Sequence, residues 1–298
     1  TEYFGGGAIL LKANGNVVKI TFTDFNNNIA NNGNGGAINI DGSNVKFGIL
    51  NCNFYGNSAK NSGGSLYVND EATNSSNKIE INKCNFEKSV ATENGGAVYL
   101  TDNISADIYN CFFKNNSVTS STQGLGGAVR GGVSYNNTFE NNSSAYLGGA
   151  LYRVDSFNST FIDNSAVEGG AMYGGAVVNC TFVGNSATKF GGAVYNPTSV
   201  SKSAFSSNTA GVLGVNSEVS KGLGGAIYNT IGLDSLINCI FTNNSATGFG
   251  GAVYNSVEDE EKQTLSIIDS EFTFNYAESG SAIYNNGKLE LLLKGEVT

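Results

Sequence analysis

The chain of 298 residues contains no histidine and no tryptophan, and its single proline is Pro197. Without histidine it lacks the side chain that most often serves as general acid, general base or metal ligand near neutral pH. Lysine and arginine together number 16 and never cluster, against 25 acidic residues, for a formal net charge of −9. Nucleic acids and anionic membrane surfaces attract basic patches, so neither is an expected partner.

Long hydrophobic runs and a targeting signal are also missing. No apolar stretch reaches the roughly 18 residues of a membrane-spanning helix, so we expect no direct membrane insertion by this segment. The first residues, Thr-Glu-Tyr-Phe, lack the basic and apolar regions of a signal peptide. The repeat described below is already under way at Gly5 and continues to Ile283. We therefore expect a segment of a longer protein.

The chain is rich in glycine and in aromatic residues. It has 40 Gly, 18 Phe and 14 Tyr, and 40% of its residues are hydrophobic. This apolar content can form a large core, which excludes a disordered chain. Glycine has no period of three, which excludes a collagen-like chain.

Glycine pairs and phenylalanines recur as two alternating motifs. The first is Gly-Gly-small-aliphatic, most often followed by Tyr. Its copies begin at Gly6, Gly35, Gly63, Gly95, Gly126, Gly148, Gly169, Gly191, Gly224 and Gly250, with a degenerate copy at Gly280. The second is Phe-x-x-Asn, in which Ser89 once replaces Asn. Its phenylalanines are Phe25, Phe54, Phe86, Phe113, Phe139, Phe161, Phe182, Phe205, Phe241 and Phe272.

Successive phenylalanines of the second motif lie 21 to 36 residues apart, with no helical pattern between them. Such short copies cannot bury an apolar face alone, which predicts a solenoid. A leucine-rich repeat would show a leucine ladder, and a propeller blade needs about 40 residues. We predict an all-β, right-handed parallel β-helix of about 10–12 coils, forming a single domain over residues 1–298.

Strand side chains alternate between two faces, which assigns the repeated positions. The residue after the small one is apolar in every copy, as in Val194, and should point inward; the next, Tyr195 in that copy, should point outward. Phe182 and the residue two before it, Cys180, share the inward face. All five cysteines occupy this second position: Cys52, Cys84, Cys111, Cys180 and Cys239.

The cysteines could form a disulfide framework, a metal site, a redox site or a column of small buried thiols. Metal sites use paired Cys or His ligands at short spacing, and no such pair occurs, so we expect no metal and no cofactor. We prefer the column of buried thiols. A disulfide between successive coils, among Cys52, Cys84 and Cys111, stays open.

The asparagine of each Phe-x-x-Asn motif is predicted at a corner, because Asn tolerates left-handed backbone and bonds to neighbouring backbone groups. Stacked coil on coil, these side chains can form an internal amide ladder. The Gly-Gly pair is expected at another corner, where positive φ or close packing excludes a Cβ. Insertions interrupt the repeat at 69–77, 117–124, 211–222 and 256–263. The last contains the acidic run 258–261, for which a solvated loop is preferred over a calcium site, since the acids lack the alternating spacing of a calcium loop.

The outward tyrosines are the candidate binding residues. Those in six successive copies of the motif are Tyr152, Tyr173, Tyr195, Tyr228, Tyr254 and Tyr284. Such a stripe could stack sugar rings or receive a strand or loop of a partner. The alternative is that the rings only stack on one another and stiffen the sheet.

Many parallel β-helices cleave acidic polysaccharides, and such hydrolysis needs carboxylates that converge on one face. Asp155, Asp163 and Glu168 lie close together in sequence and form the best acidic group. Arg130 and Arg153, the only two arginines, lie one coil apart on or beside the tyrosine stripe. Because histidine is absent and few acids converge, we expect no enzyme.

The two motifs together resemble the repeats of chlamydial polymorphic outer membrane proteins. The fuller form from Asn179 to Tyr195, Asn-Cys-x-Phe-x-x-Asn-Ser-Ala followed by Gly-Gly-Ala-Val-Tyr, is similar to adhesin-like surface proteins of methanogenic archaea. The resemblance implies an extracellular β-helix on a cell surface that acts in adhesion. The expected partner is then a surface protein or glycan of another cell, and a purely structural spacer is the alternative.

Overall fold

The computed structural model describes residues 5–15, 17–43, 46–70, 79–102, 104–211, 221–256 and 264–292. These residues form strands and turns, and none of them belongs to a helix that could cross a membrane. The chain divides into two compact units, residues 1–154 and residues 155–298. The single 1–298 domain expected from the repeat stays a prediction, and each unit is described by itself.

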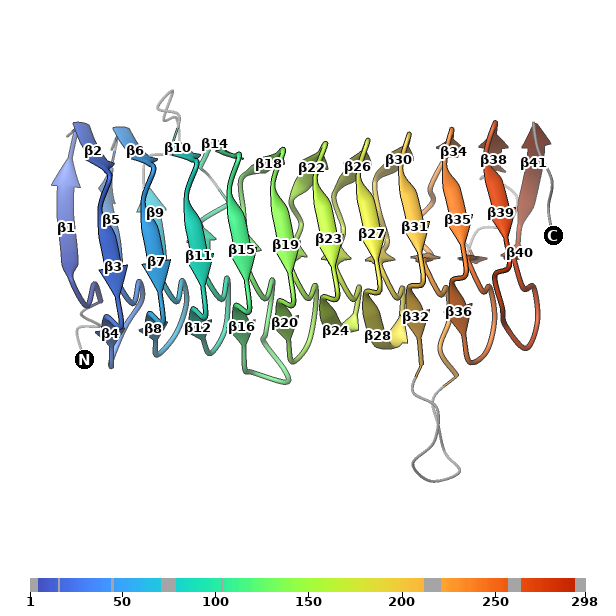
Figure 1. The fold of residues 1–298 in the computed structure, drawn as a ribbon, viewed down its shortest axis with the longest axis horizontal. Helices are drawn as coiled ribbons and strands as arrows, with labels where there is room; N and C mark the ends of the chain where they lie inside the picture. Colours follow the sequence, from blue (N-terminus) through green and yellow to red (C-terminus); the bar gives the residue numbers. More distant parts are fainter. Residues whose placement is uncertain are drawn as a thin grey trace. The chain divides into compact units, whose positions relative to one another are not determined.

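Each coil of the first unit contributes one strand to each of four parallel sheets (Figure 1). The first sheet has the order β1 (Ile9–Asn14), β5 (Ile38–Ser43), β9 (Leu66–Asp70), β13 (Val98–Leu100), β17 (Val129–Arg130), β21 (Leu151–Tyr152). The second has β2 (Val17–Thr21), β6 (Lys46–Leu50), β10 (Ile79–Asn82), β14 (Ala106–Tyr109), β18 (Val133–Tyr135). The third has β3 (Asp24–Asn26), β7 (Asn53–Tyr55), β11 (Asn85–Glu87), β15 (Phe112–Lys114), β19 (Thr138–Glu140). The fourth has β4 (Ile29–Ala30), β8 (Ser58–Ala59), β12 (Val90–Ala91), β16 (Ser117–Val118), β20 (Ser143–Ser144).

The second unit has the same four sheets. Its first sheet contains β25 (Met172–Tyr173), β29 (Val194–Tyr195), β33 (Ile227–Asn229), β37 (Val253–Ser256), β40 (Ile283–Asn286). Its second contains β22 (Asp155–Phe157), β26 (Ala176–Val178), β30 (Ser199–Ser201), β34 (Ser235–Ile237), β38 (Thr264–Ile268), β41 (Lys288–Leu292). Its third contains β23 (Thr160–Ile162), β27 (Thr181–Val183), β31 (Ala204–Ser206), β35 (Ile240–Thr242), β39 (Glu271–Thr273). Its fourth contains β24 (Ser165–Glu168), β28 (Ser186–Phe190), β32 (Thr209–Ala210), β36 (Ser245–Ala246). The parallel β-helix predicted from the repeat is confirmed.

The phenylalanines of the Phe-x-x-Asn motif form the centre of the core. Their rings stack from one coil to the next, with centroids 4.6 Å apart between Phe161 and Phe182 and 4.9 Å apart between Phe86 and Phe113. From Phe54 onward these side chains are fully buried. The stacking follows from the in-register parallel pairing, which places identical side chains above one another at the strand spacing of about 4.8 Å.

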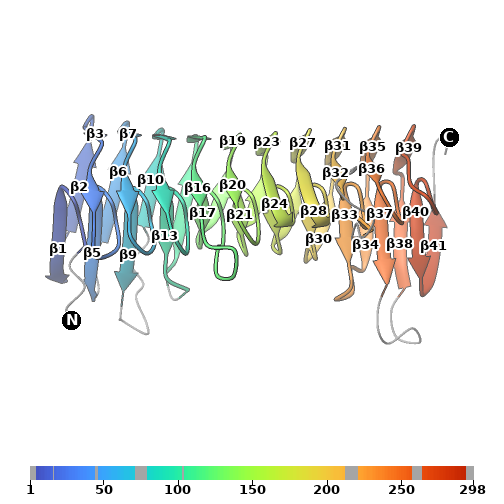
Figure 2. The same cartoon turned by 90° about the horizontal axis from the view of Figure 1, so that it is seen from below.

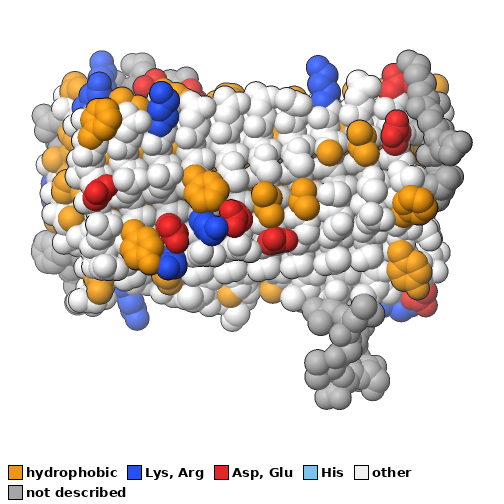
Figure 3. Space-filling view, viewed as in Figure 1, with side chains coloured by type: hydrophobic (Ala, Val, Ile, Leu, Met, Phe, Trp, Pro, Cys, Tyr) orange, Lys and Arg blue, Asp and Glu red, His pale blue; other side chains and the backbone are white. Residues whose placement is uncertain are grey.

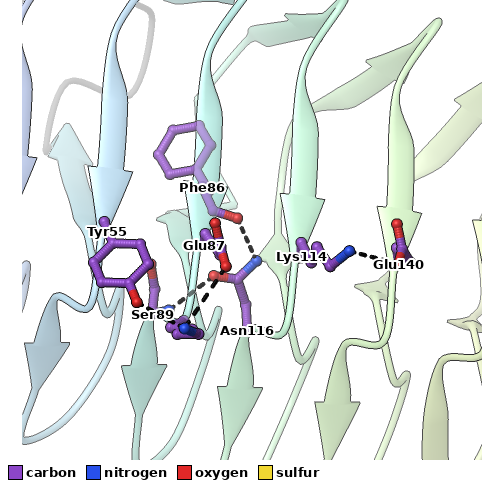
Figure 4. A network of polar contacts seen from close by, with 8 residues as sticks. Tyr55, Phe86, Glu87, Ser89, Lys114, Asn116 and Glu140 are labelled. Carbon is purple, nitrogen blue, oxygen red and sulfur yellow. Dashed lines mark hydrogen bonds and ion pairs between the residues drawn. The ribbon is translucent and has the colours of Figure 1, made fainter.

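The asparagines of the same motif form the predicted internal amide ladder. Asn116 donates from Nδ2 to the carbonyl oxygen of Phe86 at 2.9 Å, and its Oδ1 accepts from the backbone N–H of Ser89 at 2.9 Å (Figure 4). Asn185 and Asn208 repeat these contacts in the second unit. The ladder satisfies backbone groups at a corner that water does not reach, which a buried turn requires.

The cysteines are small buried thiols, as preferred from the sequence. All five lie within the described residues, and all are free and buried, so no disulfide links successive coils. The Sγ atom of Cys239 contacts the carbonyl oxygen of Ile237 at 3.4 Å. Burial raises the pKa of Cys239 to about 11, so the reactive thiolate is scarce near neutral pH.

The Gly-Gly pair lies at the corner that opens the first sheet, as predicted. Gly191 has φ +64°, which disfavours a side chain. A Cβ on Gly192 would collide with the carbonyl oxygen of Gly225 in the next coil. These glycines therefore permit coil-to-coil stacking. The acidic run 258–261 and most of the insertions at 69–77, 211–222 and 256–263 lie outside the described residues.

Candidate functional site

A column of stacked tyrosines lies along the outer side of the first sheet in the second unit. Strands β33, β37 and β40 carry three of them side by side (Figure 2). The ring centroids are 4.6 Å apart for Tyr173 and Tyr195, and 5.0 Å apart for Tyr195 and Tyr228. The column continues at 5.0 Å to Tyr254 and at 5.1 Å to Tyr284. All five side chains are half-buried, as expected of outward positions on a sheet.

This stacking determines which part of each tyrosine a partner can contact. Tyr195 and Tyr228 each have a neighbouring tyrosine ring on both sides, at interplanar angles of 22° or less. Their ring faces therefore pack against other rings, as one interpretation of the sequence predicted. What remains for a partner is a row of ring edges and phenol hydroxyls, one per coil.

A second column beside the tyrosines was not recognised from the sequence. We call it the corner column; it consists of Glu168, Phe190, Leu223 and Phe249, which pair in that order along the fourth sheet and the adjoining bridges. The Phe190 and Tyr228 ring centroids lie 4.8 Å apart, so the two columns touch. The available signal was the residue immediately before each Gly-Gly pair, which is apolar in most copies of the second half of the chain.

Glu168 is the charged member of the corner column. It is half-buried, and burial raises the pKa of its carboxyl while nearby Lys189 lowers it. A register shift between Ala166 and Glu168 interrupts the pairing of β24 with β28. Such irregularities re-aim side chains. The tyrosine column thus has a carboxylate beside its first coils.

The surroundings of the tyrosine column hold its phenols in the neutral form. Burial, the neighbouring Tyr254 and the carboxylate of Glu168 raise the pKa of Tyr228 to about 12. Burial, Glu168 and Tyr173 also raise the pKa of Tyr195. At neutral pH these hydroxyls can both donate and accept hydrogen bonds.

The raised pKa of Tyr228 predicts how the stability of the protein changes at alkaline pH. The pKa of Tyr228 is raised from 10.0 to about 12 on folding. The neutral Tyr228 side chain therefore stabilises the folded state below pH 10, and this stabilisation is lost as pH rises toward 12. We expect the tyrosinate absorbance of the folded protein to show a late-titrating class, which Tyr228→Phe reduces. In urea, all fourteen tyrosines should titrate near pH 10. A single titration near pH 10 in the folded protein would contradict this assignment.

The equivalent column of the first unit combines tyrosine with arginine. Tyr67 and Tyr99 stack at 5.1 Å, and the next position is Arg130, which pairs in turn with Tyr152. The guanidinium of Arg130 lies 5.0 Å from the Tyr99 ring and 5.8 Å from the Tyr152 ring. The guanidinium of Arg153 also lies beside Tyr152, 5.5 Å from the centre of its ring. The sequence correctly placed both arginines at the stripe, and Tyr152 belongs to this column of the first unit.

The best acidic group of the sequence does not converge in the structure. Asp155 lies on β22 of the second sheet, Asp163 follows β23 of the third sheet, and Glu168 ends β24 of the fourth. Asp155 accepts a hydrogen bond from the backbone N–H of Ala176 at 2.8 Å. Among the described residues, no cluster of acidic or thiol side chains has a metal-binding arrangement.

Exposed charges of the first unit gather on the outer side of the third sheet, over β7 to β19 (Figure 3). Lys88 donates to the Tyr55 hydroxyl at 2.7 Å, and Lys114 pairs with Glu140 at 2.7 Å (Figure 4). Lys88 is solvent-exposed, whereas Lys114 and Glu140 are half-buried and neutralise each other. These charged side chains make the face hydrophilic, and their contacts with one another do not form a binding site.

Comparison with known proteins finds similarity to the repeat of one protein family. The model of the Chlamydia polymorphic membrane protein repeat matches residues 138–152, 179–197, 202–230 and 238–256. These four segments are similar to that repeat. The match covers less than a third of the chain, and the segments contain Tyr152, Tyr195, Tyr228 and Tyr254 of the predicted stripe. No curated protein and no solved structure matches the chain.

The match confirms the resemblance stated from the two motifs. Each matched segment contains one Phe-x-x-Asn motif followed by one Gly-Gly motif. At a coarse level the match indicates a protein of the cell surface. The similarity to surface proteins of methanogenic archaea stays a prediction.

Proposed function

We propose that the chain is an extracellular, non-catalytic attachment protein, an adhesin or the stalk of one. It binds a surface glycan or surface protein of another cell. The contact is made by the tyrosine column of the second unit, from Tyr173 to Tyr284, together with the apolar members of the corner column.

The observation that carries this proposal is the row of half-buried, stacked tyrosines on the outer side of the first sheet. It lies against Phe190, whose ring contacts Tyr228 at 4.8 Å. Tyrosine is favoured at binding surfaces because it offers a large rigid apolar area and one polar tip. A partner with polar groups repeating along its length, such as a sugar chain or an extended strand, can contact one hydroxyl per coil.

Attachment is favoured over catalysis by the placement of the acids. Asp155, Asp163 and Glu168 lie on three different sheets, whereas glycoside hydrolysis needs two carboxyl groups facing one bond. A spacer role is the second candidate, because the ring faces of Tyr195 and Tyr228 are used in stacking. The two candidates differ in whether the column binds anything.

The experiment is binding of the folded 1–298 chain to whole cells and to a glycan array. It is compared with a variant in which Tyr173, Tyr195 and Tyr228 are changed together to Ser. We expect the variant to lose binding and to remain folded. The matched control changes Tyr67 to Ser, which disrupts a stacked pair of the first unit and should leave binding unchanged.

Two results would count against the proposal. If the wild-type chain binds no cell and no glycan, the spacer role is favoured. If the control loses binding as completely as the triple variant, the second unit's column does not carry the contact.

A further inference from the structure

A pocket of about 340 Å³ opens at the corner between the first and second sheets of the first unit. Its walls come from three successive coils: Thr101, Asp102 and 104–106, then 131–133, then Arg153. This volume falls at the lower end of the range of about 300–1,000 Å³ for small-molecule sites. It suits a ligand the size of one sugar ring.

Unequal corner lengths create the pocket. The connection from β13 to β14 spans residues 101–105, whereas the next coil turns through Gly131 and Gly132 alone. Both glycines have positive φ, and a Cβ on Gly132 would lie 3.0 Å from Leu100 Cδ1 and 3.1 Å from the Ala106 oxygen. The short corner therefore forms a floor without side chains beneath the longer connection.

Arg153 occupies the same corner one coil later. It adopts φ +52°, a conformation that Gly131 supplies in the preceding coil. Left-handed non-glycine residues recur at the corners of the coils, as at Lys83 and Asn196, and what distinguishes Arg153 is that it lines the pocket. Its guanidinium lies beside the ring of Tyr152, which holds the group in place and leaves its N–H edges able to donate.

Two arginines lie near the pocket, and they differ in whether a carboxylate pairs with them. Asp102 lines the pocket and pairs with Arg130 at 3.6 Å, and Arg130 also donates to the Tyr99 hydroxyl and to Asn94 Oδ1, both at 3.2 Å. Arg153, by contrast, has no carboxylate within ion-pair distance in the described part of the chain. The pocket thus presents one uncompensated guanidinium in a chain of net charge −9.

We propose that this pocket binds an acidic sugar unit through its carboxylate. Arg153 receives the carboxylate, since a guanidinium fork matches a carboxylate in geometry and charge. The hydroxyl of Ser105 and the carboxylate of Asp102 contact the sugar hydroxyls. The site belongs to the first unit, so its test does not depend on the tyrosine column of the second.

The experiment is calorimetric titration of the full 1–298 chain with glucuronate, glucose and acetate. The key variant is Arg153→Gly, which installs the residue that the preceding coil carries at this corner and should fold normally. The matched control is Lys83→Gly, which removes the same charge from an exposed residue with φ +52° outside the pocket. Thermal melts of both variants verify that they are folded.

The expected result is that the wild type and Lys83→Gly bind glucuronate more tightly than glucose or acetate. Arg153→Gly should bind glucuronate at least about tenfold more weakly, as expected for losing a hydrogen bond to a charged group. The proposal is overturned if the wild type does not bind glucuronate. It is equally overturned if glucose or acetate binds as tightly, or if the two variants behave alike.

Discussion

Replacing Phe161 by alanine is expected to lower the free energy of unfolding by about 3–5 kcal/mol. The Phe161 ring is fully buried, and its centroid lies 4.6 Å from that of Phe182. Truncation removes the apolar area of the ring and leaves a cavity that the stacked neighbours cannot fill, because their own positions are fixed by strand register. Urea unfolding of the wild type and the variant measures the difference.

The matched control is Thr160→Ala on the same strand. Thr160 points to the outer side of β23 and is only half-buried, so its truncation should change stability by no more than about 0.5 kcal/mol. A loss under about 1 kcal/mol for Phe161→Ala would mean that the phenylalanine column does not form the core.

The second large effect is expected at the asparagine ladder. Asn208 is fully buried; its Nδ2 donates to the Phe182 carbonyl oxygen at 3.1 Å and to Asn244 Oδ1 at 2.9 Å, and its Oδ1 accepts from the Asn185 N–H at 3.0 Å. Asn208→Ala leaves the Phe182 oxygen and the Asn185 N–H buried without these partners. At about 1–3 kcal/mol each, the loss is on the order of 2–6 kcal/mol in the same urea measurement.

Thr209→Ala provides the comparison for this prediction. Thr209 follows Asn208 directly and is exposed on β32. Its truncation should be nearly neutral. Equal stability losses for Asn208→Ala and Thr209→Ala would show that the ladder does not support the corner.

The fold could be predicted from the sequence because its repeated positions obey local rules. Successive coils pair in register, so equivalent positions of the motif lie above one another. Phe182 stacks on Phe161 because both occupy the same inward-facing position. The amide ladder followed from the ability of asparagine to hydrogen-bond neighbouring backbone groups. The left-handed backbone expected at the same residue lies one position earlier, as at Asn115 (φ +54°) before Asn116. The predicted cysteine position was correct for the same reason, since Cys180 lies two residues before Phe182 on the inner face.

The candidate site was only partly predictable. The sequence identified the outward tyrosines, but ring orientation depends on contacts between coils, so the packing of ring faces against each other required the structure. Glu168 was considered as a member of an acidic group, whereas in the fold it takes the place that Phe190 has in the next coil. Its sequence neighbours Asp155 and Asp163 lie on other sheets, because each corner of a coil redirects the chain.

The pocket at Arg153 was beyond sequence reasoning for a different reason. It depends on the difference in length between two neighbouring corners, 101–105 and 131–132, and on how closely one passes beneath the other. A repeat pattern identifies what the coils share. Sites made by what differs between coils need three-dimensional positions.

The central claim is that the outward hydroxyls of the tyrosine column make the attachment. The most direct test is whole-cell binding by a variant in which Tyr173, Tyr195 and Tyr228 are changed together to Phe. This variant keeps the stacked rings and removes only the hydroxyls, so its melting temperature should match the wild type. The account predicts that binding is lost; binding at the wild-type level by the folded phenylalanine variant would contradict it.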